Sequence, residues 1–427
     1  MNMTEIAAVA KSASILLAAA KTETKDRALA HVARALRDNG AKIVAANKQD
    51  LAEAQKNKLA APLLKRLKFD EEKIGQVVTG IESLISLEDP VGKTLAATEL
   101  DAGLELYKVS CPIGVIGVVF ESRPDALVQI STLCLKSGNA VLLKGGSEAT
   151  RTNRILTETI AEASEKAGLP KGWIQLLETR EDVAEMLALD EYIDLVIPRG
   201  SNEFVRYIMN NTNIPVLGHA EGLCHVYVDG DADVEMAVNI AVDSKCQYIA
   251  VCNAAETLLV DSAIAERFLP KVKAALEEKG VELRGCKETA AIIDVKPAAE
   301  TDWSTEYLDY ILSIKLVDGL DEAIGHINRY GSKHTDAIVT ADKEKAERFM
   351  ALVDSANVFW NCSTRFSDGF RYGLGAEVGI STSKIHARGP VGLDGLAIYK
   401  WKLYGKGQIV SDYVGLNARK FTHKKLR

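Results

Sequence analysis

The sequence predicts an α/β fold made of two doubly wound parallel α/β domains and a separate β hairpin. Three patterns carry this prediction. Short apolar strands alternate with helices over residues 113–218, a second alternating set follows from residue 224, and residues 94–111 are β-like. Strands that alternate with helices form parallel sheets, because each helix returns the chain across the sheet before the next strand begins.

The first 90 residues are predicted to be helical and to form a layer that packs on a later sheet. Apolar residues between Leu29 and Leu36 repeat at helical spacing, and Gly40 is typical of a residue that closes such a helix. The pair Asp89 and Pro90 ends the helical segment. Further helices are expected over residues 41–56, 61–66 and 71–86.

The next stretch changes character and is predicted to form a hairpin. Leu104, Leu106 and Val109 fit a strand, and Asp101–Gly103 fits its turn. Near the C-terminus, residues 396–403 and 407–410 are β-like again.

The two alternating sets follow from short apolar runs bounded by turn residues, with one set on each side of a boundary near Gly218–Gly222. In the first set, strands are expected at 113–120, 140–143, 174–177, 195–197 and 216–218, and helices at 124–136, 148–167, 181–187 and 201–209. In the second set, strands are expected at 224–228, 257–260, 337–339 and 358–360, and helices at 234–244, 263–278 and 343–353.

Composition excludes several classes of protein. The chain is 47% hydrophobic and 26% charged with a net charge of -7, which does not favour nucleic-acid binding. We interpret the basic tail Lys420–Arg427 as a solvated terminus. The seven cysteines form no CxxC pair, which favours a reducing cytoplasm over a disulfide framework and predicts no metal site. No membrane span is expected, and the segment up to Ala20, interrupted by Lys11, is an amphipathic helix rather than a signal peptide.

Cys252 is the candidate nucleophile. It lies between an apolar approach, Tyr248–Val251, and a predicted buried strand, a position from which a thiolate can face a cleft. By itself the pattern also fits an inert core cysteine. Cys246, six residues earlier, is the rival nucleophile.

Two strand-to-helix turns are candidates for holding a cofactor, although no GxGxxG fingerprint is present. In Leu142–Glu148 a predicted strand is followed by two glycines and the start of a helix, where free backbone N–H groups attract an anion. Lys144 and Ser147 in this turn suit an adenosine 2′-phosphate, and hence NADP. Val196–Asn202 repeats the arrangement with Gly200. An ordinary turn with a surface lysine is the alternative for the first.

Three stretches carry a resemblance to a known family. Gly114–Asp125, Val251–Val260 and the motifs within Arg365–Leu393 resemble the signatures of the γ-glutamyl phosphate reductase (glutamate-5-semialdehyde dehydrogenase) family. The likeness extends over about residues 5 to 410, and the chain is similar, more distantly, to the aldehyde dehydrogenase superfamily.

The resemblance implies an aldehyde-dehydrogenase-like architecture in three parts. Residues 1–93 and 113–220 would form a Rossmann-like NADP-binding domain, 221–395 a catalytic domain, and 94–112 with 396–427 an oligomerisation β element. It also implies a homo-oligomer.

The implied reaction is the NADPH-dependent reduction of L-glutamyl 5-phosphate to L-glutamate 5-semialdehyde with release of phosphate, in proline biosynthesis. The family also occurs fused to a glutamate 5-kinase. Because no kinase-sized segment precedes residue 1, we expect the reductase alone, with a separate kinase as a possible functional partner.

The resemblance also implies roles near the reacting carbon. Cys252 would form a thioester, while its backbone N–H and Asn253 would be candidate oxyanion donors. His219 falls where hydrolytic relatives carry a general-base Glu, so it would be an active-site wall or a proton donor. Arg123 falls where the superfamily has its oxyanion-holding Asn, and we expect Arg123 and Arg365 to bind the anionic substrate. For each arginine an ordinary ion pair is the alternative.

For the cofactor, the resemblance implies that Glu306 holds the nicotinamide ribose, with a surface or helix-cap Glu as the alternative. Gly200 and Ser201 are assigned to the pyrophosphate end, and Lys144 and Ser147 to the adenosine end.

Two other functions fit parts of the pattern. An oxidising or CoA-acylating aldehyde dehydrogenase would use the same cysteine, but would be expected to show a general-base Glu or a CoA site. A catalytically silent scaffold is disfavoured because Cys252 and the glycine-rich motifs are intact.

Overall fold

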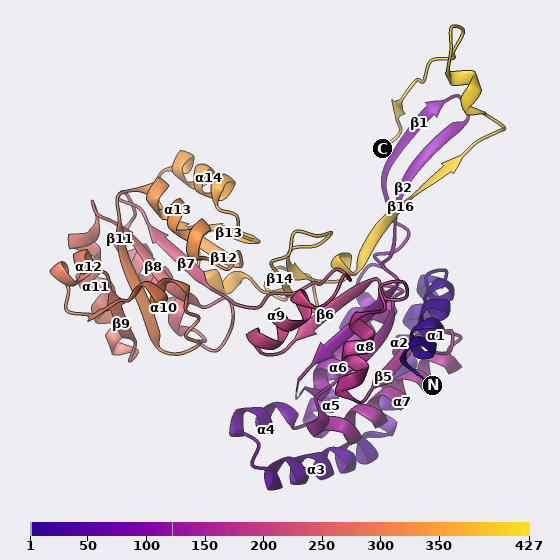
Figure 1. The fold of residues 1–427 in the computed structure, drawn as a ribbon, viewed down its shortest axis with the longest axis horizontal. Helices are drawn as coiled ribbons and strands as arrows, with labels where there is room; N and C mark the ends of the chain where they lie inside the picture. The colour runs from indigo at the N-terminus through magenta and orange to yellow at the C-terminus, as the bar shows by residue number, and fades with distance from the viewer. Residues whose placement is uncertain (1, 122) are drawn as a thin grey trace.

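The computed structural model describes residues 2–121 and 123–427, apart from the side chains of Pro62 and Arg180. Figure 1 shows two α/β lobes side by side and a narrow β arm that extends away from them. The predicted α/β class with parallel sheets is confirmed. Ser122, inside the first family motif, lies outside the described residues.

Helices fill the first part of the chain, as predicted, but their layer is placed differently. Their bounds are α1 (Met3–Leu17), α2 (Thr22–Asp38), α3 (Gly40–Lys56), α4 (Ala61–Leu67) and α5 (Glu71–Ser86). Of these, α1 packs on the sheet, whereas α2, α3 and α5 pack on the helices that cover it. Gly40 was predicted to close a helix, which is wrong: α2 ends at Asp38 with Asn39 as its cap, and Gly40 begins α3.

The first sheet has four parallel strands in the order β5-β4-β3-β6. Its strands are β3 (Val115–Phe120), β4 (Ala140–Lys144), β5 (Ile174–Leu177) and β6 (Leu195–Arg199), and its helices are α6 (Pro124–Lys136), α7 (Thr150–Lys166), α8 (Arg180–Leu187) and α9 (Asn202–Asn210). All residues of β3 and β4 are buried, as expected for strands covered on both faces. The strand expected at 216–218 is a single bridge between Val216 and Val196.

The second sheet has seven parallel strands in the order β10-β9-β11-β8-β7-β12-β13. The strands are β7 (Cys224–Val228), β8 (Ala255–Asp261), β9 (Glu282–Gly285), β10 (Lys296–Pro297), β11 (Ile311–Val317), β12 (Thr335–Val339) and β13 (Asn357–Trp360). The helices are α10 (Val234–Cys246), α11 (Ala265–Glu278), α12 (Lys287–Ile292), α13 (Leu320–Tyr330) and α14 (Lys343–Leu352). Two separate apolar cores lie on the two faces of the sheet, one with α10 and α11 and the other with α13 and α14.

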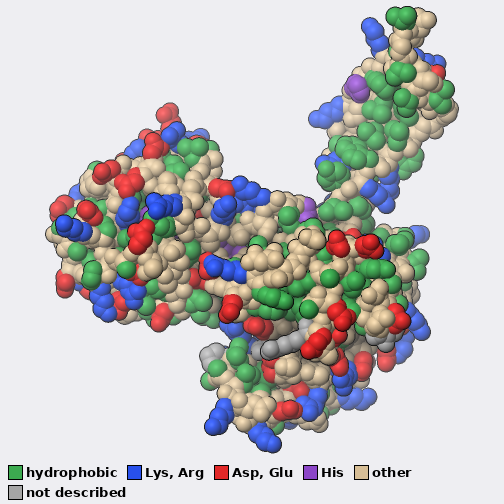
Figure 2. Space-filling view, in the orientation of Figure 1, with side chains coloured by type: hydrophobic (Ala, Val, Ile, Leu, Met, Phe, Trp, Pro, Cys, Tyr) green, Lys and Arg blue, Asp and Glu red, His purple; other side chains and the backbone are tan. Residues whose placement is uncertain are grey.

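The arm is an antiparallel sheet of β16 (Ala397–Tyr404), β2 (Leu104–Pro112), β1 (Thr94–Asp101) and β17 (Lys424–Lys425). The predicted hairpin is therefore present, and a C-terminal strand extends it: β16 pairs with β2 along its whole length. The strand expected at 407–410 is wrong, because that segment leads into a 3₁₀ turn, Val410–Tyr413. Many apolar side chains of the arm are exposed, as Figure 2 shows.

Two short strands, β14 (Gly379–Ser381) and β15 (Gly389–Val391), form an antiparallel pair within the last family motif. Among the helices of the described residues, none combines the length and the apolar composition that a membrane crossing requires.

Candidate active site

A cleft of about 710 Å³ lies where residues from the first α/β lobe meet residues from the second. The turn after β6 and the start of α9 line one side, and the loop that carries Cys252 lines the other. The segment that leads into β14 completes the lining. Six residues assigned to the site from the sequence meet in this cleft: Arg123, Gly200, Ser201, His219, Cys252 and Glu306.

Cys252 lies in the loop between α10 and β8 and is half-buried. The two ends of this loop are joined by a buried ion pair, with Lys245 Nζ 2.5 Å from Glu256 Oε2. Gly222 packs directly on the Cys252 backbone: a Cβ at Gly222 would lie 2.0 Å from the Cys252 carbonyl oxygen. The position of the thiol is therefore set from both sides of its loop.

His219 approaches the thiol with a defined tautomer. Its Nδ1 lies 2.8 Å from the carbonyl oxygen of Ile380. A carbonyl can only accept, so Nδ1 carries the hydrogen and Nε2 keeps its lone pair. Burial lowers the pKa of His219, with the Ile380 carbonyl opposing that shift, so the ring is neutral near pH 7. A neutral Nε2 can accept the proton of a thiol.

His334 is a second imidazole at the thiol, and sequence reasoning missed it. The ligand atoms of His219, Cys252 and His334 all lie within 4.8 Å of one another. His334 is fully buried just before β12, and its ring meets that of His219 edge-on with centroids 4.8 Å apart. No local motif marks this histidine, because only the order of the strands brings it beside Cys252.

Arg199, the last residue of β6, also lines the cleft and was not assigned a role from the sequence. Burial lowers the pKa of Arg199, and the positive charge of Arg123 lowers it further. Charges on Glu377 and Cys252 act in the opposite direction, which places this guanidinium within electrostatic reach of the thiol. Arg123 lines the same cleft and also pairs with Asp125 at 3.5 Å. Cations beside a nucleophile form an environment suited to an anion.

Glu306 connects the two sides of the cleft. Its Oε2 accepts from the Asn202 side-chain amide at 2.7 Å, and its Oε1 accepts from the Gly222 backbone N–H at 2.9 Å. Ser201 caps α9, accepting from the backbone N–H of Phe204. The turn at Gly200 therefore presents a helix start to the cleft, as predicted from the sequence.

Two of the residues predicted to act near the reacting carbon, Asn253 and Arg365, lie outside the cleft lining. Asn253 is buried, and its side-chain NH₂ donates to the Ser367 carbonyl oxygen at 2.7 Å, so one of the two N–H groups of this amide already has a protein partner. A buried amide is stabilised by such a partner, and the backbone supplied one. Arg365 is also buried and donates through Nε to Gln247 Oε1 at 2.9 Å. The Cys252 charge still acts on its guanidinium.

Neither of the residues assigned to the adenosine end lines the cleft. Lys144 is buried, and its Nζ donates to the carbonyl oxygen of Gly145 at 2.5 Å. Ser147 is exposed and lines a separate hollow of about 550 Å³ with Arg151 and Arg154. The turn predicted from the sequence exists, but its lysine is held by the backbone.

Cys246 does not line the cleft. It is the last residue of α10, and burial raises the pKa of its thiol. Cys252 is thus the better placed of the two candidate nucleophiles.

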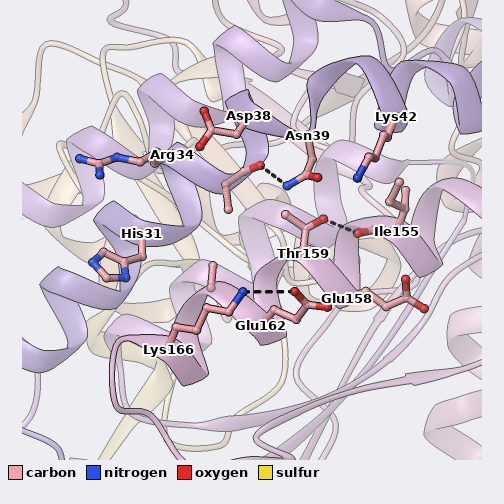
Figure 3. A pocket seen from close by; sticks show the side chains of 12 residues that line it. His31, Arg34, Asp38, Asn39, Lys42, Ile155, Glu158, Thr159, Glu162 and Lys166 are labelled. Atoms are coloured by element: carbon pink, nitrogen blue, oxygen red, sulfur yellow. Dashed lines mark hydrogen bonds and ion pairs between the residues drawn. The ribbon is translucent and has the colours of Figure 1, made fainter.

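A further hollow of about 420 Å³ lies on the outer helices α2, α3 and α7 (Figure 3). Its polar side chains mostly bond within their own helix: Lys166 pairs with Glu162, and the Asn39 amide donates to the Ala35 carbonyl. It contains no arrangement comparable to the thiol and imidazoles of the cleft.

Comparisons with known sequences and structures agree on the family to which the chain is similar. A sequence model described as the aldehyde dehydrogenase family matches residues 2–289. The chain is 68% identical to the γ-glutamyl phosphate reductase of Pelotomaculum thermopropionicum, with 100% of this chain and 98% of that protein covered. It is 67% identical to the enzyme of that name from Acetivibrio thermocellus, over 100% and 99% of the two chains. The crystal structure of γ-glutamyl phosphate reductase from Thermotoga maritima matches with a TM-score of 0.94 and 40% identity, over 96% of this chain and 100% of that one.

Proposed function

Because the chain belongs to the aldehyde dehydrogenase family and, within it, to the γ-glutamyl phosphate reductases, we propose that it reduces L-glutamyl 5-phosphate to L-glutamate 5-semialdehyde, with NADPH as reductant and release of inorganic phosphate. This reaction is a step in proline biosynthesis. The proposal rests on one observation above all: a thiol lies beside a neutral imidazole in a cleft that also holds two arginines.

The first step is proposed to be attack by Cys252. The sulfur adds to the acyl carbon while His219 Nε2 accepts the thiol proton and passes it to the departing phosphate. A thioester on Cys252 and inorganic phosphate result. Arg199 and Arg123 would hold the phosphate as it leaves, because both line the cleft that holds the Cys252 thiol.

The residues at the other end of the cleft fit a nicotinamide cofactor. The start of α9 at Gly200 and Ser201 offers backbone N–H groups to a pyrophosphate, and the Glu306 carboxylate can accept from ribose hydroxyls. When bound, the cofactor would supply hydride to the acyl carbon. The Cys252 sulfur then leaves as a thiolate, and the aldehyde is released.

Preference for NADPH over NADH is also part of the proposal. The residues proposed to bind the 2′-phosphate are now Arg151 and Arg154 rather than Lys144. The hollow beside Ser147 contains Arg151 and Arg154, which are cations suited to a 2′-phosphate. Both are paired with carboxylates, Arg151 with Asp50 and Arg154 with Glu178, so a bound 2′-phosphate would have to replace these partners. Lys144, in contrast, would act through the Gly145 carbonyl that it holds.

The reverse reaction tests the function. Glutamate 5-semialdehyde and NADP are mixed with the enzyme, with and without inorganic phosphate, and NADPH formation is followed by absorbance. We expect NADPH only when phosphate is present, because the thioester can then be released as an acyl phosphate. Formation without phosphate would indicate a hydrolytic aldehyde dehydrogenase, and formation that requires CoA would indicate an acylating one; either result rejects the proposal.

Arg199 is expected to be a phosphate-binding residue. In Arg199→Gln, the KM for inorganic phosphate in the reverse reaction should rise by about tenfold to a hundredfold, since an Arg–phosphate contact contributes roughly 1.5–3 kcal/mol. The KM for the semialdehyde should change little, because the α-carboxylate lies at the far end of the substrate.

The control for this prediction is Arg388→Gln, which removes an arginine that binds Asp354 instead of lining the cleft. A phosphate KM that is the same in Arg199→Gln and in the wild type would show that another group binds the phosphate.

The arm is proposed to associate with a second copy of the chain. Tyr399, Trp401, Leu403 and Tyr404 of β16 are each at least half exposed, and exposed apolar strands of this kind are usually covered by a partner. Sedimentation of the full chain at micromolar concentration should give more than the monomer mass, and a monomer would contradict this assignment. A separate glutamate 5-kinase remains the proposed functional partner.

A further inference from the structure

Three side chains in the cleft have the composition of a zinc site. Cys252 offers a sulfur and His219 and His334 each offer a ring nitrogen, and the three ligand atoms lie within 4.8 Å of one another. They come from three separate segments: the loop after α10, the stretch before β7 and the residue before β12. Thiolate and imidazole are the ligands that zinc-class cations prefer.

Each imidazole has one ring nitrogen held by the protein and the other one available. In His219, the Ile380 carbonyl holds Nδ1–H and leaves the Nε2 lone pair available. In His334, Nδ1 lies 2.8 Å from Thr335 Oγ1, whereas Nε2 is buried and has no hydrogen-bond partner within the described part of the chain. Metal-binding histidines typically have one nitrogen held by the protein in this way. An unpartnered buried nitrogen is also costly, and a cation would stabilise it.

We propose that Cys252, His219 and His334 bind a thiophilic divalent cation of the zinc class, which reversibly blocks the nucleophile. Binding forms a metal–sulfur bond and releases the thiol proton to solvent, so neither oxidant nor reductant is needed. The sequence predicted no metal site, and the cation inferred here is an inhibitor rather than part of the reaction.

To bind one metal ion, the three ligand atoms must move closer together. With metal–sulfur and metal–nitrogen bonds of about 2.3 and 2.0 Å, tetrahedral ligand atoms lie roughly 3.3–3.6 Å apart. Atoms up to 4.8 Å apart must therefore approach by about 1 Å. Cys252 is half-buried and lines the cleft, so rotation of its side chain can supply this movement while the Ile380 carbonyl still holds His219. The fourth position would face the cleft and hold water or chloride.

Inhibition follows from the same bond. A sulfur lone pair shared with the metal is not available to attack an acyl carbon, and the bound imidazole can no longer accept a proton. The inhibitory effect rests on the proposed role of Cys252, whereas cation binding itself does not.

Binding is tested directly on the full-length reduced protein. Co²⁺ is titrated while the sulfur-to-metal charge-transfer absorption is followed, and Zn²⁺ is titrated by calorimetry. We expect one tight site per chain, loss of the charge-transfer band in Cys252→Ala, and at least a tenfold weaker affinity in His334→Gln. Cys362→Ala is the control, because it removes another half-buried cysteine outside the cleft and should leave binding unchanged.

Several outcomes would overturn the inference. Unchanged affinity in His334→Gln would show that the thiol binds the cation without this ring, and a charge-transfer band that survives in Cys252→Ala would place the site elsewhere. If circular dichroism shows that His334→Gln does not fold, His219→Gln carries the same test. Chelator-reversible inhibition of NADPH formation is measured separately, so that failure of the catalytic proposal cannot be mistaken for failure of the cation site.

Discussion

Cys252→Ala should abolish phosphate-dependent NADPH formation, with a loss in kcat on the order of 10⁴-fold or more. Without the sulfur no thioester can form, and the remaining groups of the cleft can only bind and orient the substrate. Initial rates of the reverse reaction with saturating phosphate measure the loss. Intact-protein mass spectrometry after mixing with the acyl phosphate should show the acyl adduct on the wild type and not on the variant.

Cys246→Ala is the matched control, because it removes the rival cysteine from the same stretch of chain. It should keep activity within about threefold of the wild type, since this residue lies outside the cleft and burial raises the pKa of its thiol. The reverse result, with Cys252→Ala active and Cys246→Ala inactive, would move the nucleophile to the end of α10.

Gly222→Ala should reduce both activity and stability, although it adds only one methyl group. The new Cβ would lie 2.0 Å from the Cys252 carbonyl oxygen and 2.4 Å from its Cα, so the loop must move by about 1 Å. A displacement of that size at a reacting group lowers kcat on the order of 100-fold. Overpacking also destabilises by about 1–3 kcal/mol, measured by urea unfolding. The bond from the Gly222 N–H to Glu306 would be disturbed at the same time.

Gly218→Ala is the control, since its Cβ would meet nothing closer than Pro198 Cγ at 3.4 Å, which is an ordinary contact. It should change kcat by less than tenfold and leave stability nearly unchanged. Wild-type kcat in Gly222→Ala would mean that the exact placement of the Cys252 backbone has little influence on the reaction.

Much of the fold was predictable because secondary structure depends on neighbours in the sequence. The helices α5 (Glu71–Ser86) and α6 (Pro124–Lys136) and the strands β5 (Ile174–Leu177) and β7 (Cys224–Val228) match their predicted bounds, since each is a periodic apolar run between clear turn residues. Residues 282–330, in contrast, were not assigned. Within this range β9 and β10 have only four and two residues, too few for a local pattern to show. In contrast, β11 is an apolar run and α13 has apolar residues at helical spacing, so both had a local signal that the prediction missed.

Some residues of the candidate active site could be predicted from the sequence, and others could not. Cys252, Gly200 and Ser201 were predicted from the sequence and line the cleft. A glycine before a helix is a local signal, whereas Cys252 was chosen over an inert core cysteine because of the family resemblance. Other residues needed the tertiary structure. Arg199 was in a quoted motif, but its role depends on which cleft the end of β6 faces.

His334 and Asn253 show why the sequence alone does not determine every site residue. A side chain's role depends on which groups meet it, and those groups come from distant segments placed by strand order and by the packing of the two lobes. The sequence by itself determined the α/β class, the candidate nucleophile and the family resemblance. Only the tertiary structure decided that His334 reaches the thiol and that the Ser367 carbonyl holds the Asn253 amide. Local pattern encodes which faces are apolar, whereas convergence at a site depends on contacts between residues far apart in the chain.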